Sequence, residues 1–260
     1  MRPQGRTLCR CADMPTSLRT SDVHERRLRL AAHVRACRID GQVILLDLSK
    51  NKYLGVDDSR LPALADAIGG WPAWPTPQVP SNSGAAIDKL TAPLLQRGLL
   101  SYDPIERSVA AEVQEATASL NAEEAMRTAR LGPRRIQRLL CGAACAAIKL
   151  RYRSLFVIAA GVAARRVRHA RTPNIPPIDR LREAVAAYMR MRPFVLSTHD
   201  RCLNDSLTLL HFLAAEGAFP RWVIGVRTRP FGAHSWIQMD GVALNDQHEH
   251  VRQYRPILVV

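Results

Sequence analysis

THDRCLNDSLTLLHFLAAEG at residues 198–217 predicts a helix with candidate capping residues at its start, and it is followed by two predicted strands, RWVIGVRT (221–228) and HSWIQM (234–239). The leucines at 203, 207, 210 and 213 recur at helical spacing, and Gly217 is a typical residue just past a helix end. Asp240-Gly241 is a turn signal that leads into VALND (242–246). A helix followed by a hairpin predicts an α+β domain in this part of the chain.

The start of this helix carries a candidate nucleophile. If Asp200 caps the helix, Cys202 lies in its first turn, where free backbone N–H groups and the helix dipole favour a thiolate or an oxyanion. A thiolate nucleophile also needs a general base, usually an oriented imidazole. His234, at the start of a predicted strand, is the candidate base, and Asp246 is the candidate residue to orient it. These residues predict a cysteine hydrolase with a Cys-His-Asp triad.

The register of the hairpin decides whether His234 meets Asp246. A two-residue loop at Asp240-Gly241 pairs Met239 with Val242 and places His234 and Asp246 on opposite faces. A three-residue loop with a bulge at Gly241 pairs His234 directly with Asp246. We predict the three-residue loop, because it fits Gly241 equally well and assembles the base with its orienting carboxylate.

The same region allows a metal-dependent hydrolase as an alternative. If the strand continued beyond Asp246, then Asp246, His248 and His250 would share a face and could bind a borderline metal together with His234. His199 and Asp205 are further candidates for a base or a substrate contact near Cys202. Two cysteine pairs, Cys9 with Cys11 and Cys141 with Cys145, lack the second half of a zinc motif. We predict no metal and no cofactor.

The chain is strongly basic. Its 260 residues contain 37 Lys and Arg and 23 Asp and Glu, a net charge of +14, which raises a basic winged-helix nucleic-acid-binding protein as an alternative. Residues 111–178 hold 12 of these basic groups and only 4 acidic ones. The helix expected at 85–97 offers only Lys89 and Arg97, which is few for a recognition helix. The surplus therefore favours a docking role, or simply a solvated helical face, over base reading.

The sequence contains neither a secretory signal nor a membrane span that we can identify. MRPQGRTLCRCADMP at the start lacks an apolar segment, and the most apolar stretch, 139–164, is interrupted by Lys149, Arg151 and Arg153. We therefore expect a cytoplasmic protein whose six cysteines are not in disulfides. A basic amphipathic helix in peripheral contact with a membrane remains an alternative.

The N-terminal half predicts a small α+β module behind a loose tail, residues 1–27. Alternation in LAAHVRACRID (30–40), then VILLDL (43–48) and YLGV (53–56), predicts a meander, with turn residues between the strands. Residues 60–69 predict a short helix, 71–84 a Pro-rich loop, and 85–103 a helix that ends near Gly98 and is kinked or broken at Pro93. Residues 108–170 have helical spacing, with Arg134, Arg135 and Arg138 on one side, and a helix over 178–192 should stop at Pro193.

RCLNDSLTLLHFLAAEG, WVIGVRTRPFGAHSWIQMDGVALND and YRPIL together resemble the leader peptidase, or B protein, of lasso-peptide biosynthesis. The resemblance covers about 150–260 and extends to the transglutaminase-like branch of the papain-like cysteine proteases. It implies that Cys202 is the nucleophile, His234 the base and Asp246 the orienter. It also implies a precursor-peptide substrate and a separate, asparagine-synthetase-like macrolactam cyclase as a partner.

DGQVILLDLSKNKYLGVD (40–57) and the helices after it resemble the PqqD-like, winged-helix precursor-recognition domain. The resemblance implies that a leader peptide adds as a strand to the sheet edge and packs on the last helix, contacting Lys52, Tyr53, Leu54, Ile87, Leu90 and Leu94. We therefore predict four segments. These are a tail (1–27), a leader-recognition domain (28–105), a basic helical connector (106–177) and the catalytic core of a cysteine peptidase (178–260).

Overall fold

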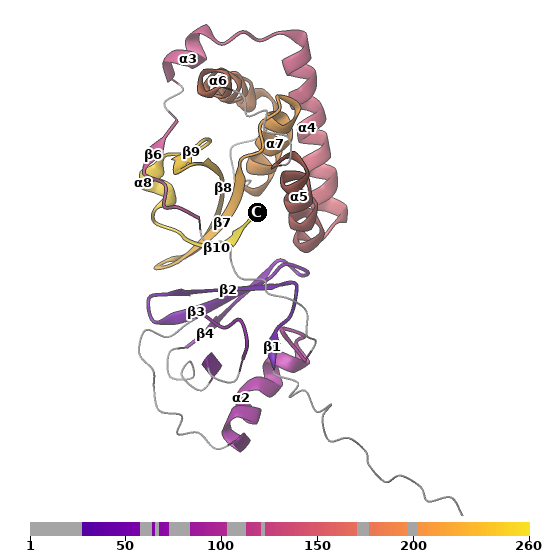
Figure 1. Cartoon of the computed structure of the whole chain (residues 1–260), viewed down its shortest axis with the longest axis vertical. Helices are drawn as coiled ribbons and strands as arrows, with labels where there is room; N and C mark the ends of the chain where they lie inside the picture. The colour runs from indigo at the N-terminus through magenta and orange to yellow at the C-terminus, as the bar shows by residue number, and fades with distance from the viewer. Residues whose placement is uncertain are drawn as a thin grey trace, which may run out of the picture.

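The structure is a computed structural model that describes residues 28–57, 64–65, 68–72, 84–102, 113–120, 123–170, 177–196 and 202–260. Strands and helices up to residue 102 form the lower part of the molecule in Figure 1, and those from residue 113 onward form the upper part. The α+β architecture predicted from the sequence is confirmed.

The N-terminal part contains the predicted antiparallel meander. β2 (Val34–Ile39), β3 (Gln42–Asp47) and β4 (Lys52–Val56) pair in that order. Asp40 and Gly41 have φ of 47° and 75°, the conformation that a two-residue type I′ turn needs. In the second turn, the Asp47 carboxylate accepts the backbone N–H groups of Ser49 and Lys50. The first turn is therefore favoured by residues that tolerate positive φ, and the second by a side chain that hydrogen-bonds the backbone of the turn.

α2 (Gly84–Gln96) follows, and β5 (Leu100–Ser101) then pairs with β1 (Arg29–Leu30). Gly98, with φ of 72°, lies just beyond the helix end, where we predicted it. α2 continues through Pro93 without a break, because a proline in the last turn removes only one helical hydrogen bond. The helix and Pro-rich loop expected at 60–69 and 71–84 lie largely outside the described residues.

The C-terminal part is built on a five-stranded sheet in the order β10-β7-β8-β9-β6. The strands are β6 (Ala118–Ser119), β7 (Arg221–Thr228), β8 (Phe231–Met239), β9 (Val242–Ala243) and β10 (Arg255–Val259). Helix α7 (Cys202–Ala215) packs on β8, and α4 (Pro133–Tyr152) packs on α7. The other helices are α3 (Glu123–Thr128), α5 (Leu155–Ala170), α6 (Ile178–Val195) and the short α8 (His248–Val251).

Two expectations about helices in this part are wrong. Residues 113–120 are extended, because their backbone groups bond to the hairpin: Thr117 N donates to Gly241 O, and Leu120 N donates to Ala243 O. β6 thereby pairs in parallel with β9, so helical structure in 108–170 is limited to α3, α4 and α5 among the described residues. α6 also continues past its expected stop to Val195, because Pro193 falls in its last turn.

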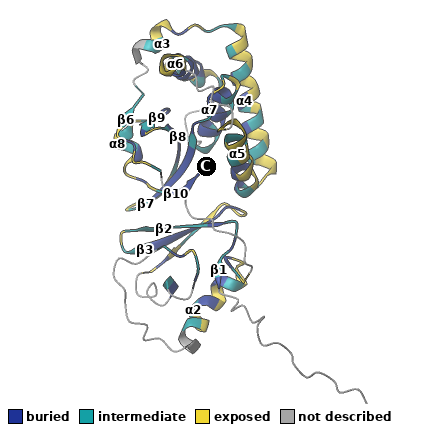
Figure 2. Ribbon diagram, viewed as in Figure 1, coloured by how far each residue is buried: buried dark blue, intermediate teal, exposed yellow. Residues whose placement is uncertain are grey.

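The two parts share an apolar interface through β3. Val43 and Leu45 belong to the core beneath α2, whereas Ile44 and Leu46 belong to the core of the C-terminal part. Successive strand residues point to opposite faces, so both faces of β3 are covered, as the dark ribbon in Figure 2 shows. The C-terminal core also includes apolar residues of α4 and α5. The described part of the expected connector therefore packs against the helices of the C-terminal domain.

Candidate active site

Cys202 is the first residue of α7, and its free thiol is partly exposed. The first backbone N–H groups of an α-helix have no partner within the helix, so they are available to an anion at this end. The expected N-cap, Asp200, and the candidate base His199 lie outside the described residues.

His234 lies in β8 opposite Gly225 of β7. Its Nε2 is 2.6 Å from Oδ2 of Asp246. Cys202 lies close enough to His234 to contribute to raising the pKa of its imidazole. Because Nε2 faces the carboxylate, Nδ1 is the ring nitrogen available to the thiol. The structure thus pairs His234 with Asp246 and places Cys202 in the neighbourhood of the same imidazole.

The hairpin register that we predicted is wrong. Met239 pairs with Val242, and Asp240 and Gly241 both have positive φ, as in the two-residue type I′ loop. In that register a regular ladder would place His234 and Asp246 on opposite faces. The pairing that we used to support the triad is therefore absent, and the two residues meet for another reason.

The reason is that β9 ends at Ala243, and beyond it the side chain of Asn245 accepts a hydrogen bond that a backbone carbonyl would accept in a continued strand. Leu244 N still donates to Ile237 O, but Ile237 N donates to Oδ1 of Asn245 instead of to a backbone carbonyl. The backbone after Asn245 is thereby released from the ladder. Residues 244–246 form bends rather than strand, and this irregular segment brings Asp246 to His234.

Asn245 also ties this segment to the helix that carries Cys202. Its Nδ2 donates to Oδ2 of Asp205, a residue of α7 that is 7% exposed. The other carboxylate oxygen of Asp205 accepts from the hydroxyl of Tyr188, at 2.7 Å, and lies 3.1 Å from Nε of Arg192. Asp205, which we considered as a base or substrate contact, therefore links α6, α7 and the Asp246 segment.

The charges of the site favour a protonated imidazole beside an ionised carboxylate. Burial lowers the pKa of His234, but its hydrogen bonds to Asp246 and Cys202 and their negative charges outweigh that effect and raise the pKa to about 9. Burial likewise raises the pKa of Asp246, but hydrogen bonds from His234, His250 and the Gln247 backbone hold it below the usual range. The imidazole is therefore held as a cation at neutral pH.

His250 is a fourth member of the cluster. Its Nδ1 lies 3.0 Å from the same Asp246 oxygen, and its ring packs 4.8 Å from that of His234. Residues 248–251 form α8 rather than a continued strand, so His248 lies elsewhere, against Ser119. His234, Asp246 and His250 offer ligand atoms within 4.8 Å of one another, whereas His248 is not part of this set.

The predicted leader-binding residues divide between the two faces of β4. Leu54 and Leu90 pack partly against the N-terminal core, and Leu94 is buried within it. Ile87 is half-buried on α2, and Lys52 is exposed. Tyr53 lies on the other face, where its ring meets Phe231 of β8 at 5.6 Å. Burial raises the pKa of Tyr53 to about 12, and the thiol groups of Cys202 and Cys37 add to the rise. Tyr53 therefore brings the N-terminal domain close to Cys202.

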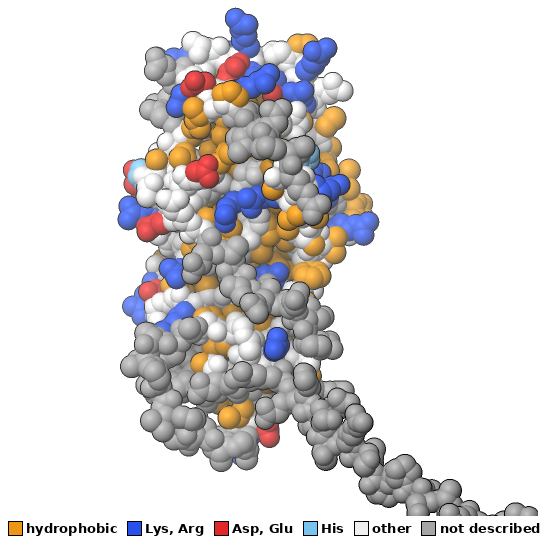
Figure 3. Space-filling model, in the orientation of Figure 1, with side chains coloured by type: hydrophobic (Ala, Val, Ile, Leu, Met, Phe, Trp, Pro, Cys, Tyr) orange, Lys and Arg blue, Asp and Glu red, His pale blue; other side chains and the backbone are white. Residues whose placement is uncertain are grey.

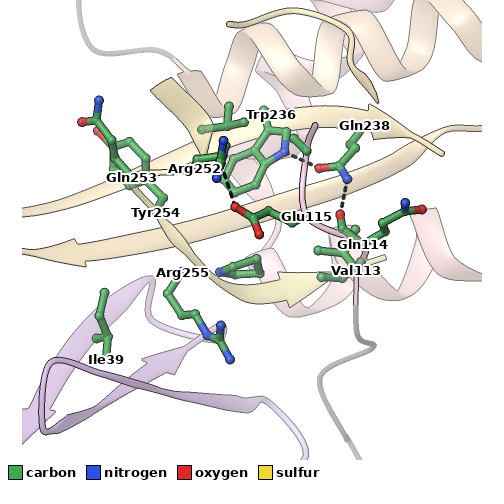
Figure 4. A pocket seen from close by; sticks show the side chains of 14 residues that line it. Ile39, Val113, Gln114, Glu115, Trp236, Gln238, Arg252, Gln253, Tyr254 and Arg255 are labelled. Atoms are coloured by element: carbon green, nitrogen blue, oxygen red, sulfur yellow. Dashed lines mark hydrogen bonds and ion pairs between the residues drawn. The ribbon is translucent and has the colours of Figure 1, made fainter. Parts of the chain in front are cut away.

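A cavity of about 540 Å³ adjoins this cluster (Figure 4). Trp236 and Tyr254 line the cavity, and their rings lie 6.0 and 5.2 Å from the imidazole of His234. Its polar rim includes Gln238, which hydrogen-bonds Trp236 Nε1, and the Arg252–Glu115 ion pair. Neither Cys202, His234 nor Asp246 lines the cavity, so it lies behind the candidate site rather than in it.

Sequence reasoning missed Asn245 and Tyr188, and it singled out Tyr53 and His250 for other roles, a leader contact and a metal ligand, than the contacts that they make in the structure. A buried asparagine directly before the predicted orienter was a usable signal, since Asn side chains readily replace a backbone group. The contacts of Tyr188 and Tyr53 bridge distant segments, which leave no local pattern.

Residues 141–259 match the model of the transglutaminase-like superfamily. The C-terminal half of the chain contains a transglutaminase-like domain. Over 45 residues the chain is also 42% identical to the microcin J25-processing protein McjB of Escherichia coli, a match that covers 17% of this chain and 22% of that protein. No solved structure matches the chain. The transglutaminase-like domain begins within α4, so α4 and α5 fall largely inside the matched region.

Proposed function

We propose that this protein is a cysteine endopeptidase that binds the leader of a ribosomally made lasso-peptide precursor and removes it. The observation that supports the proposal is the hydrogen bond between His234 and Asp246, with Cys202, the first residue of α7, near the same imidazole. The transglutaminase-like domain supports cysteine chemistry. The short match to a microcin-processing protein supports a peptide precursor as the substrate.

In the proposed reaction, His234 already holds the proton of the Cys202 thiol as an imidazolium, so Cys202 is a thiolate, and Asp246 stabilises this imidazolium. The thiolate attacks the carbonyl carbon of the last leader residue, and N–H groups at the start of α7 stabilise the oxyanion. As the C–N bond breaks, His234 returns the proton to the amine of the core peptide. Water then attacks the thioester with neutral His234 as the base, releasing the leader and restoring the thiolate and the imidazolium.

The N-terminal domain is proposed to hold the leader by strand addition to β4. Among the described residues, β4 is an edge strand of its sheet. A peptide paired there would alternate its side chains between the α2 side, with Leu54, Leu90 and Ile87, and the Tyr53 side, next to the site. Lys52, exposed at the start of β4, would contact the peptide from the edge. Leu94 would support this surface from the core.

Because the proposed leader-binding domain and the nucleophile belong to one chain, binding of the leader would raise the effective concentration of the scissile bond at Cys202. In this proposal residues 28–105 recognise the leader, and the later residues cleave it. The released core peptide would then pass to a separate, ATP-dependent macrolactam-forming cyclase. Cytoplasmic localisation is part of the proposal.

The test is incubation of the precursor with the purified full chain, followed by mass spectrometry of the products. We expect a separate leader and core from the wild type, and none from Cys202→Ala. Cys145→Ala, which changes another free cysteine outside the cluster, should cleave normally. Incorporation of one oxygen from labelled water into the leader carboxylate would distinguish hydrolysis from transfer to an added amine. Intact precursor with the wild type, or cleavage by Cys202→Ala, would refute the proposal.

A metal-dependent hydrolase is the second candidate, favoured by the proximity of His234, Asp246 and His250. It predicts that a chelator abolishes cleavage and that thiol alkylation does not. The peptidase proposal predicts the opposite result with both reagents. The same assay therefore separates the two chemistries.

A further inference from the structure

α4 has an apolar surface on both of its sides. The run LLCGAACAAI (139–148) contains no charged residue. Leu139, Gly142 and Ala146 are buried and face the domain. On the opposite side, Leu140 and Ile148 are 53% and 59% exposed. A helical segment that is apolar on all sides is normally buried on all sides. The exposed outer side of the 139–148 run therefore indicates an interaction surface.

Exposed apolar side chains lie along α4 and also on α5, the next helix in the chain. Ile136, Leu140, Ile148 and Tyr152 recur at intervals of four or eight residues along an oblique row that winds around the exposed part of α4, and Val157 and Val167 are at least half exposed on α5. These two helices hold six of the ten large apolar side chains that are exposed among the described residues. The two helices lie together at the outer edge of the C-terminal part (Figure 1). We call this set the α4–α5 surface.

The charges around the α4–α5 surface are all of one sign. The sequence contains no Asp or Glu between Glu124 and Asp179. Arg134, Arg151, Arg153 and Arg168 are exposed around the apolar row, and none forms an ion pair with a described residue. By contrast, Arg135 and Arg138, on the inner side of α4, pair with Glu183 and Glu216. In Figure 3 this edge of the molecule shows apolar and basic side chains without acidic ones.

We propose that the α4–α5 surface docks on an anionic phospholipid bilayer. An apolar row with arginines near both ends is the pattern of a helix that lies in the plane of a membrane interface. The apolar side chains would enter the boundary between headgroups and acyl chains, while the arginines contact lipid phosphates. No described helix is long and apolar enough to cross a membrane, so the contact is with the surface only. The proposal is independent of peptidase activity.

The test is flotation of the full-length protein with vesicles of phosphatidylcholine alone and with vesicles containing one quarter phosphatidylglycerol. We expect the protein to float with the anionic vesicles, little with the neutral ones, and less as salt is raised. The triple variant Arg134→Gln/Arg151→Gln/Arg153→Gln should bind roughly a hundredfold more weakly, since each arginine near an anionic leaflet contributes about fivefold. Leu140→Gln/Ile148→Gln should bind at least about tenfold more weakly.

Matched controls remove equal charge or apolar area elsewhere. Arg127→Gln/Arg130→Gln/Arg180→Gln removes three exposed arginines near α3 and α6, and Phe194→Gln removes a side chain that is 87% exposed on α6. Both controls should bind as the wild type does, and circular dichroism should show that every variant is folded. No flotation of the wild type, equal flotation with neutral vesicles, or equal losses in the control variants would overturn the proposal. The first of these outcomes would instead favour an acidic protein as the partner.

Discussion

Replacing Asn245 with alanine should cost more than removing any exposed polar residue nearby. The change deletes both hydrogen bonds of the side chain, one accepted from Ile237 N at 2.9 Å and one donated to Asp205 at 3.1 Å. Ile237 is fully buried, so its N–H would remain without a partner, at a cost of about 1–3 kcal/mol. The lost bond to a carboxylate adds about 1.5–3 kcal/mol. We expect Asn245→Ala to destabilise the C-terminal domain by roughly 3–5 kcal/mol.

The assay is thermal denaturation followed by circular dichroism, in which this loss lowers Tm by roughly 10 °C for a unit of this size. Gln247→Ala is the matched control, because Gln247 is two residues away and its side chain is exposed. It should leave Tm within about 2 °C of the wild type. A loss below about 1 kcal/mol for Asn245→Ala would refute the idea that this side chain replaces the strand ladder.

The same variant should also impair cleavage of the precursor below its melting temperature. The Asn245 side chain bonds the segment that carries Asp246 to α7, which begins at Cys202. Without this side chain, Asp246 would no longer be held at a fixed position relative to α7. We expect kcat to fall roughly tenfold to a hundredfold with little change in KM. A double-mutant cycle with Asp205→Asn should show strong coupling, because the two residues are hydrogen-bonded. Additive effects would show that Asn245 and Asp205 act separately.

Three further changes test other parts of the domain. Burial and two neighbouring cations, Lys149 and Arg165, lower the pKa of His211 to about 4. The free energy of unfolding therefore falls as pH drops from 6.5 towards 4. In melting curves recorded over this range, His211→Gln should show a smaller fall in Tm than the wild type. His234 has a raised pKa of about 9, so its contribution is full below pH 6.5 and is lost as pH rises through 9; the Tm difference between wild type and His234→Asn should shrink over that range. Gly225→Ala should lower the free energy of unfolding by about 2 kcal/mol or more in a denaturant titration, because a Cβ would lie 2.8 Å from the Trp236 ring. Gly161→Ala should raise it slightly, because Gly161 lies on a helix and a Cβ there meets open space.

Elements with a strong local pattern were predictable from the sequence. The meander, α2, α7 and the β7–β8 hairpin each have their own periodicity and turn residues, and all are present in the structure. The secondary-structure prediction failed where tertiary contacts determine the backbone conformation. Residues 113–120 have a helix-forming, Ala-rich composition, yet they are extended because the edge of β9 offers them hydrogen bonds. Prolines were given too much weight, since two helices carry one in their last turns.

The candidate site was predicted by residue type, but not by the geometry that assembles it. We chose the hairpin register that aligned His234 with Asp246, and the structure has the other register. The inference failed because it assumed that pairing continues beyond Ala243. A single side chain, Asn245, satisfies the N–H that the next ladder residue would have paired and so allows the chain to turn. Spacing rules describe regular strands, and functional residues here lie just beyond the end of one.

The arrangement of β3 bears on how the proposed recognition and the proposed cleavage would be coupled. A small sheet that acted alone would have one polar face, but β3 buries alternate residues in two different cores. The N-terminal part therefore contacts the C-terminal part through apolar side chains of β3. Tyr53, on the edge strand of the same sheet, is held by this contact beside Phe231 and close to Cys202. A leader paired with β4 would then end at a defined distance from the thiol. In that case the fold would set the number of residues between the bound segment and the cleaved bond, and the sequence at the cleaved bond would matter less.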